Sequence, residues 1–290
     1  MEFPLAGAEV PRLVALDEAG STNDELAERA RSEASAWPDL SVLVTDDQTR
    51  GRGRLGRTWM APSGKTLAIS ILLRPRLAGG AELPPDALGW LPLLAGAAMT
   101  RAVRAVVLPG AGEGRASEPD ESAVIDGDGT GGVDVWLKWP NDVLISGYKV
   151  CGILSELLAD QHAVIIGSGL NVSLDEHDLP TLTSTSLSLV THAPVDADAV
   201  LADYLRRFAR LYRDFLGSGA DAAASGLARE VAELCGTLGT RVRVELPGGA
   251  ELVGVAESLD DAGRLVVRDE ADAEGGSRAV AAGDVTHLRY

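Results

Sequence analysis

The stretch at residues 51–57, "GRGRLGR", decides whether the chain has a dinucleotide-binding fold. Its glycines spell G-x-G-x-x-G, the fingerprint of the dinucleotide-binding turn of a doubly wound α/β fold. That turn needs a strand directly before it, a helix directly after it and an acidic residue about 20 positions later. Here the preceding strand ends several residues early, Pro62 and Gly64 forbid a helix, and the later position reads "ILLRPR". The dinucleotide interpretation is therefore rejected.

The same stretch places three arginines in an acidic chain of 290 residues, with 43 Asp and Glu, 26 Lys and Arg, and a net charge of -17. Surfaces that bind nucleic acids neutralise phosphates with Lys and Arg, so this balance argues against a nucleic-acid partner. Glycine lets a backbone approach a ligand closely, and arginine forks bind carboxylate or phosphate oxygens with paired hydrogen bonds. We interpret the stretch as a clamp for a small anion, with an ordinary solvated loop as the alternative.

The composition is that of an ordinary globular protein, with 46% hydrophobic and 24% charged residues. Two cysteines and four histidines are scattered without metal-ligand spacing, so reduced thiols, no metal site and a cytoplasmic location are expected. The N-terminus has neither the basic nor the apolar region of a secretory signal. The most apolar stretch, residues 87–108, contains two arginines, and its uninterrupted apolar run is too short to span a bilayer, so a buried helix is expected. No membrane partner is predicted.

Periodicity around the arginine stretch predicts strands interleaved with helices. A Thr-x-x-Glu pattern at residues 22–25 is a capping box that opens a helix. Residues 66–73, "TLAISILL", alternate strictly, which predicts a strand with one large apolar face and one small-residue face that leaves room for a ligand. Two apolar runs around Ser146-Gly147 predict a hairpin, and residues 162–173 predict a strand that ends in a glycine-rich turn. Further elements are expected as strands at 40–45 and 133–140 and helices at 196–216 and 221–235.

Two changes in residue composition and pattern along the chain suggest the domain organisation. Residues 109–132 contain seven glycines, six acids and one arginine, which predicts a disordered acidic insertion. From Thr240 the chain reads as short alternating strands separated by turn residues, which predicts a small β domain. We therefore expect a larger domain over residues 1–236 and a C-terminal β domain over residues 237–290.

Three further segments join the arginine stretch in a specific order. Ser-Thr-Asn at residues 21–23 comes first, Gln48 and GRGR-x-GR follow, and then come KWPND with K-x-x-G-I and finally G-x-G-x-N at residues 167–171. From Ser21 to the C-terminus, apart from the insertion, this order resembles the biotin–protein ligases, also called biotin–[acetyl-CoA-carboxylase] ligases. The resemblance implies an α+β fold, with a mixed sheet and helices of the class II synthetase and biotin ligase type followed by a small SH3-like β-barrel. About twenty residues precede Ser21, which resembles the short class without an N-terminal DNA-binding domain.

The activity that the resemblance implies has two steps. Biotin and ATP, with Mg²⁺ held largely by the phosphates of ATP, give biotinyl-5′-AMP, and biotin then passes to a lysine of a biotin carboxyl carrier domain of an acyl-CoA carboxylase. The protein itself is expected to be a monomer or a weak homodimer. A lipoate–protein ligase or octanoyl transferase of the same fold is one alternative, and a non-catalytic regulator that binds biotin or its adenylate is another. Gln48 and the arginine stretch favour the biotin branch.

The resemblance also implies roles for individual residues. Lys149, Arg54 and Asp142 are expected to be catalytic, Asp142 by orienting or deprotonating the acceptor lysine. Trp59 and Lys138 fit structural and functional roles equally well. Residues 21–23 could merely cap a helix, although a cap also holds side chains rigidly for a ligand. Biotin is expected to contact Ser21, Thr22, Asn23, Gln48, Arg52, Gly53, Arg54 and Lys149, and the nucleotide to contact Arg57, Gly167, Gly169 and Asn171.

Overall fold

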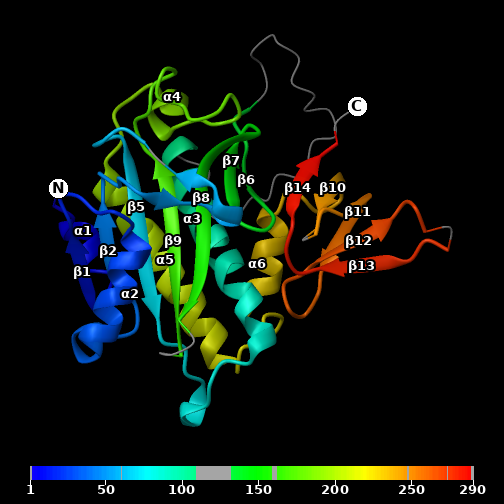
Figure 1. The fold of residues 1–290 in the computed structure, drawn as a ribbon, viewed down its shortest axis with the longest axis horizontal. Helices are drawn as coiled ribbons and strands as arrows, with labels where there is room; N and C mark the ends of the chain where they lie inside the picture. Colours follow the sequence, from blue (N-terminus) through cyan, green and yellow to red (C-terminus); the bar gives the residue numbers. More distant parts are fainter. Residues whose placement is uncertain are drawn as a thin grey trace.

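The computed structural model describes residues 2–59, 61–108, 132–158, 162–246, 248–272 and 274–288. Its centre is a seven-stranded mixed sheet (Figure 1). The first two strands in sheet order pair in parallel, and every other neighbouring pair is antiparallel. In sheet order the strands are β1 (Arg12–Ala15), β2 (Ser41–Thr45), β5 (Thr66–Leu73), β9 (Ala163–Asn171), β8 (Tyr148–Leu158), β7 (Asp142–Ile145) and β6 (Val135–Lys138).

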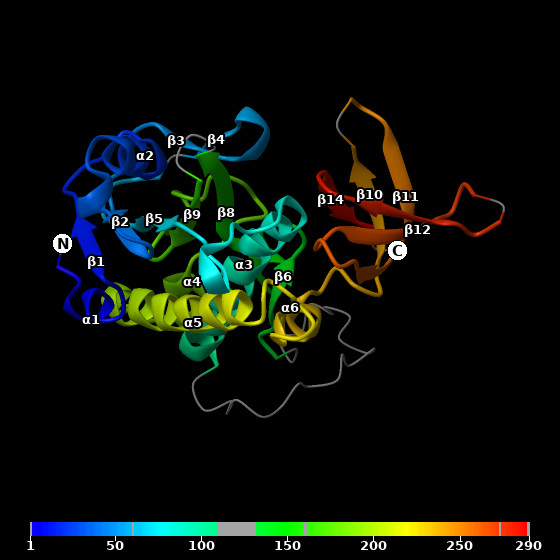
Figure 2. The same cartoon turned by 90° about the horizontal axis from the view of Figure 1, so that it is seen from below.

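Helices cover the two faces of the sheet unequally. Figure 2 shows the long helix α5 and the shorter α6 on one side of the sheet, and α2 with the hairpin of β3 (Gly51–Arg52) and β4 (Thr58–Trp59) on the other. The described helices are α1 (Pro4–Gly7), α2 (Thr22–Ser32), α3 (Trp90–Val107), α4 (Leu187–Thr191), α5 (Ala197–Gly217) and α6 (Leu227–Leu234). The expected helix at 221–235 is thus shorter than predicted, because Gly226 takes a left-handed φ of 81° and the helix begins after it.

Strand β5 bears out the predicted two-faced pattern. Its large residues Leu67, Ile69, Ile71 and Leu73 belong to the main hydrophobic core. The small residue Ala68 points away from them and lines a pocket. The alternation therefore faces one side of the strand to the core and leaves the other side open for a ligand.

Helix α3 is the buried core helix that the sequence predicted, although it begins at Trp90 after the 3₁₀ turn Pro85–Gly89. By length and composition alone the combined helical segment Pro85–Val107, arginines included, is long and apolar enough to cross a membrane, whereas the expectation concerned only its uninterrupted apolar run. Most of its surface is buried, because it packs against α5, α6 and the sheet. The segment is therefore part of the hydrophobic core of the protein.

The local turns agree with the sequence in one case and differ in another. Ser146 and Gly147 both have positive φ, 48° and 83°, which is the geometry of a two-residue hairpin turn between β7 and β8. Helix α2 does begin where predicted, but Ser21 rather than Thr22 is its N-cap, and Ser21 Oγ accepts from the Asp24 N–H. Thr22 is the first residue of the helix, and its side chain donates to Gln48 instead of capping.

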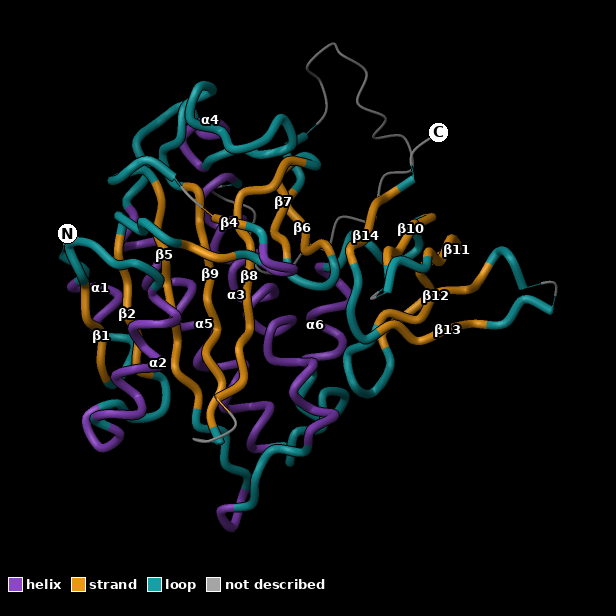
Figure 3. Tube along the Cα trace, viewed as in Figure 1, coloured by secondary structure: helices purple, strands orange, loops and turns teal. Residues whose placement is uncertain are grey.

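A second, five-stranded antiparallel sheet follows α6 (Figure 3). Its strands, in the order β13-β12-β11-β10-β14, are β10 (Arg241–Glu245), β11 (Glu251–Leu259), β12 (Leu265–Asp269), β13 (Ser277–Val280) and β14 (Asp284–His287). Two indole N–H groups join it to the first body: Trp90 donates to the Asp261 carbonyl at 2.7 Å and Trp139 to the Gly263 carbonyl at 3.1 Å. The mixed sheet, the helices and the C-terminal β domain confirm the predicted fold class.

The predicted insertion, residues 109–131 in particular, lies outside the described residues.

Candidate active site

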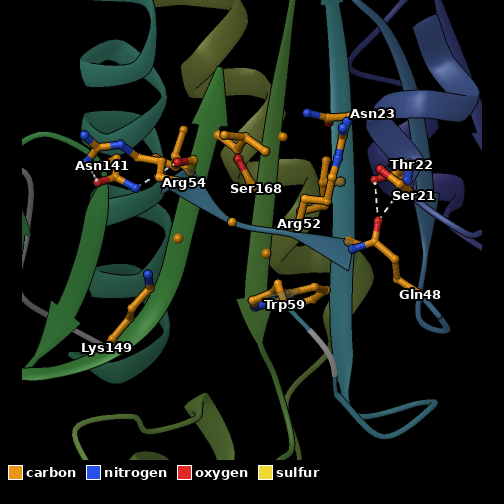
Figure 4. A pocket seen from close by; sticks show the side chains of 18 residues that line it. Ser21, Thr22, Asn23, Gln48, Arg52, Arg54, Trp59, Asn141, Lys149 and Ser168 are labelled. Carbon is orange, nitrogen blue, oxygen red and sulfur yellow. Dashed lines mark hydrogen bonds between the residues drawn. The ribbon is translucent and has the colours of Figure 1, made fainter. Parts of the chain in front are cut away.

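A pocket opens on the face of the main sheet that α2 shares with the hairpin of β3 (Gly51–Arg52) and β4 (Thr58–Trp59) (Figure 4). The predicted site residues that line it are Ser21, Thr22, Asn23, Gln48, Arg52, Gly53, Arg54, Lys149, Gly167 and Gly169. Trp59, for which both roles had been open, also lines it. Ile153 and Leu154, which sequence reasoning missed, complete the wall together with Ala68 of the small-residue face and Asn141 of the KWPND segment. Segments up to 148 positions apart therefore meet in one cavity.

Three glycines make room for functional side chains. A Cβ atom on Gly167 would lie 2.6 Å from Asn23 Oδ1, and one on Gly169 would lie 2.7 Å from the Trp59 ring. A Cβ on Gly152 would lie 2.8 Å from Lys149 Nζ. All three belong to extended strands, so the prediction of a glycine-rich turn at residues 167–169 was wrong. These glycines are needed for close approach rather than for a turn.

One end of the pocket is a network of neutral polar groups. The Thr22 backbone N–H and hydroxyl both donate to Gln48 Oε1, at 2.8 and 3.1 Å. The Ser70 hydroxyl lies 2.8 Å from Thr22 Oγ1 and 2.6 Å from Asn23 Oδ1. The small-residue face of the strand at 66–73 was the signal that could have identified Ser70. Fixed donors and acceptors in a buried position can recognise a polar ring of matching pattern.

The stretch at residues 51–57, here called the Gly/Arg loop, crosses over the pocket mouth. Arg54 points back into the protein, where it donates to Asn141 Oδ1 at 2.7 Å and to the carbonyl of Gly283, the residue before β14, at 3.1 Å. Burial lowers the pKa of the Arg54 guanidinium from its ordinary value, yet arginine keeps its charge at neutral pH. A half-buried cation therefore stands at the pocket. Arg57 instead pairs with Asp284 of β14, outside the pocket lining.

Lys149 brings a second cation to the same end. It follows the hairpin turn on β8, and its ammonium lies 2.7 Å from Asp142 Oδ1. Asp142 is therefore paired with Lys149 in this structure. Lys138 lies close behind on β6, where burial lowers the pKa of its amine and the charge of Asp142 partly offsets that shift. The pocket thus has a neutral hydrogen-bonding end and a cationic end, which suits an elongated ligand with an anionic tail.

Asn171 lies outside the pocket lining, as the predicted catalytic residue Asp142 does. Its side-chain amide donates to the Thr185 carbonyl at 2.9 Å, which fixes the end of β9 to the segment before α4. The four predicted nucleotide contacts therefore divide: Gly167 and Gly169 line the pocket, whereas Arg57 and Asn171 do not.

Both cysteines are buried and poorly reactive. Burial raises the pKa of the Cys151 thiol to about 12, so it stays protonated and a poor nucleophile. Burial likewise raises the pKa of Cys235. Within the described ranges no three His, Cys, Asp or Glu side chains gather to hold a metal ion.

Comparison with known proteins gives a consistent family assignment. The model of the "Biotin/lipoate A/B protein ligase family" matches residues 19–171, and that of the "Biotin protein ligase C terminal domain" matches residues 237–288. The chain is 36% identical to a biotin–[acetyl-CoA-carboxylase] ligase of Mycobacterium tuberculosis, over 98% of this chain and 92% of that protein. It is 30% identical to the bifunctional ligase/repressor BirA of Bacillus spizizenii, over 89% and 70%. The solved structure of a biotin protein ligase from Aquifex aeolicus in complex with biotin and ATP superposes with a TM-score of 0.69 at 26% identity, covering 97% and 100% of the two chains.

Proposed function

The chain belongs to the biotin/lipoate A/B protein ligase family, and we propose that it is an ATP-dependent biotin–[acetyl-CoA-carboxylase] ligase. The observation that carries this proposal is the pocket with two unlike ends. Residues 21–23 with Gln48 supply neutral donors and acceptors at one end, and Arg54 with Lys149 supplies two cations at the other. Biotin has the complementary arrangement, a polar ureido ring, an apolar body and a terminal carboxylate.

The proposed binding mode follows from the lining. The ureido ring meets the polar network, where the amide, hydroxyl and backbone groups are already oriented by one another. The apolar ring and tail lie between Trp59 and Leu154 of β8. The carboxylate then faces Arg54 and Lys149, beside the space that the α-phosphate of ATP must enter.

In the first step a carboxylate oxygen of biotin attacks the α-phosphorus of ATP. A bond forms between this oxygen and the α-phosphorus. The bond between the α-phosphorus and the oxygen that bridges it to the β-phosphorus breaks, and pyrophosphate leaves with the bonding electrons. Both reactants are anions, so their repulsion must be cancelled as the pentacoordinate phosphorus forms. One cation about 4 Å away supplies about 4 kcal/mol at a surface-like dielectric, which corresponds to about a thousandfold in rate. Lys149 and Arg54 are the cations that the pocket places there.

In the second step the ε-amine of a carrier lysine attacks the acyl carbon of the mixed anhydride, an amide bond forms and AMP leaves. The amine must lose a proton, and Asp142, which lies outside the pocket lining, is the carboxylate paired with the lining residue Lys149. We propose that Asp142 orients Lys149 before the reaction and accepts this proton once Lys149 has turned to the phosphate. The acceptor is proposed to be the biotin carboxyl carrier domain of an acyl-CoA carboxylase, in line with the name of the mycobacterial relative.

Mg²⁺ is proposed to arrive with ATP. The described residues that line the pocket include no carboxylate, and the two beside it are already engaged, Asp142 with Lys149 and Glu156 with Asn23 and Arg52, rather than forming a dedicated set of oxygen ligands. They therefore fit an ion held mainly by phosphate oxygens and water. When bound, the ion would neutralise part of the triphosphate charge.

Pyrophosphate exchange into ATP tests the activating half of the proposal. The protein should catalyse exchange with biotin, and exchange with lipoate or without any acid should remain at background. Exchange with lipoate but not biotin would assign the chain to the other branch of its family. Absence of exchange with either acid, in a protein that still binds biotin, would indicate a non-catalytic regulator.

Substituting Gly167 by alanine should raise the KM for biotin about tenfold, since overpacking typically costs 1–3 kcal/mol. The added methyl group would lie 2.6 Å from Asn23 Oδ1 and must displace that side chain. Gly217→Ala is the matched control, because Gly217 ends α5 and a Cβ there meets nothing within 4 Å. A KM for biotin that is the same in both variants would contradict the placement of Asn23 in the biotin pocket.

A further inference from the structure

Glu156 of β8 is engaged with the pocket although no sequence motif points to it. It lies two residues beyond Leu154, so the two side chains share the pocket face of the strand. Its Oε2 accepts from Asn23 Nδ2 at 2.6 Å. Its carboxylate also accepts from Arg52, at 3.0 and 3.3 Å. One half-buried carboxylate thus contacts both the polar end of the pocket and the Gly/Arg loop.

The first contact decides which way the Asn23 amide faces. A side-chain amide has a donor end and an acceptor end, whereas an ionised carboxylate can only accept. Glu156 therefore holds the Nδ2 end, and Oδ1 is turned to the Ser70 hydroxyl at 2.6 Å. The second N–H of Nδ2 remains to be donated to a ligand. Without Glu156, rotation of the amide by half a turn would replace that donor by an acceptor.

The second contact joins the Gly/Arg loop to the same carboxylate. Arg52 Nη2 lies between Glu156 and Asp24, 2.5 Å from Asp24 Oδ1. The Arg52 side chain is 47% exposed, so either ion pair alone contributes little. Their significance is geometric, because the arginine can reach both carboxylates only when β3 lies across the pocket mouth.

We propose that Glu156 is a positioning residue that couples recognition of the ureido ring to closure of the Gly/Arg loop. It orients Asn23 toward the ring and holds Arg52 over the bound adenylate, and it touches neither reacting atom. This inference rests on the proposed function. Glu156 therefore affects biotin affinity and adenylate retention, while Lys149 and Arg54 still carry out the chemistry.

Two substitutions separate these roles. Glu156→Ala removes both contacts and should raise the KM for biotin about tenfold and the dissociation rate of biotinyl-AMP about fivefold, with kcat reduced less than threefold. Glu156→Gln keeps an acceptor oxygen for Asn23 but turns an N–H₂ group to Arg52. It should therefore raise the dissociation rate about as much as alanine does, with a rise of less than threefold in the KM for biotin. Asp24→Asn weakens only the Arg52 contact. It should therefore raise the dissociation rate of biotinyl-AMP and leave the KM for biotin unchanged.

The readouts are steady-state pyrophosphate exchange, single-turnover release of labelled adenylate and thermal unfolding. Glu257→Ala, at a carboxylate of similar exposure paired with Arg268 in the C-terminal sheet, is the control for charge removal and should match the parent protein. A double substitution with Asn23→Ala supplies a test that a purely structural role would not meet. If Glu156 acts through Asn23, adding Glu156→Ala to Asn23→Ala should raise the KM for biotin less than twofold further.

Each outcome bears on the inference. Equal rises in KM for Glu156→Gln and Glu156→Ala would overturn the orientation of Asn23, and full additivity in the double variant would do the same. An unchanged dissociation rate in both Glu156 variants would overturn the coupling to the loop. Failure of the parent protein to catalyse biotin-dependent exchange would instead reject the proposed function, which this design shows separately.

Discussion

Replacing Lys149 by alanine should lower biotin-dependent pyrophosphate exchange by at least about a thousandfold, the effect of losing one well-placed cation. Two anions would then meet without the ammonium that faces them, and Asp142, now without its partner at 2.7 Å, would add a third negative charge. The folded protein should persist, since Lys149 is 39% exposed and contributes little packing. This substitution therefore separates chemistry from stability.

The measurement is exchange at saturating biotin together with thermal unfolding. Lys65→Ala is the matched control, because Lys65 has similar exposure and pairs with Asp175 and Asp178 away from the pocket lining. We expect Lys65→Ala to retain exchange within about threefold. Normal exchange in a folded Lys149→Ala protein would remove Lys149 from the mechanism.

The substitution Arg54→Gly should release the reactive adenylate and label bystander proteins. Arg54 is the half-buried cation of the Gly/Arg loop, and its bonds to Asn141 and to the Gly283 carbonyl hold the loop between the two sheets. Its loss removes a fork that binds the mixed anhydride and opens the site to water. Lys149 still neutralises the phosphate, so retention of the adenylate should suffer more than its formation.

The experiment incubates the variant with biotin, ATP and albumin and detects biotin on albumin by blotting. Arg76→Gly, which removes another loop arginine paired at the surface with Glu82, is the control and should leave albumin unlabelled. If Arg54→Gly also leaves albumin unlabelled and holds the adenylate as tightly as the parent protein, the clamp hypothesis is wrong.

What the sequence predicted well depends on short-range periodicity. The two faces of residues 66–73 and the hairpin at Ser146-Gly147 follow from neighbouring residues alone, and both are present. The motif segments also converge as expected, since ten of the predicted residues line one pocket. Local pattern and motif order were sufficient for the fold and for most of the lining.

What the sequence could not predict depends on contacts between distant segments. Gly167 and Gly169 suggested a turn, but they are small because Asn23 and Trp59 lie against them. Arg57 belongs to the same motif as Arg54 yet turns to Asp284, a contact across 227 positions. Glu156 looked like an ordinary strand residue, because its partner Asn23 is 133 positions away. Such pairings become visible only when the chain is folded.

The central claim is that this protein joins biotin to one lysine of a carrier domain. Mass spectrometry of a purified biotin carboxyl carrier domain, incubated with the protein, biotin and ATP, tests it most directly. We predict a mass gain of one biotin, located on a single lysine and absent when ATP or the protein is omitted. An unmodified carrier domain, together with transfer of lipoate or octanoate to a lipoyl domain under the same conditions, would contradict the claim.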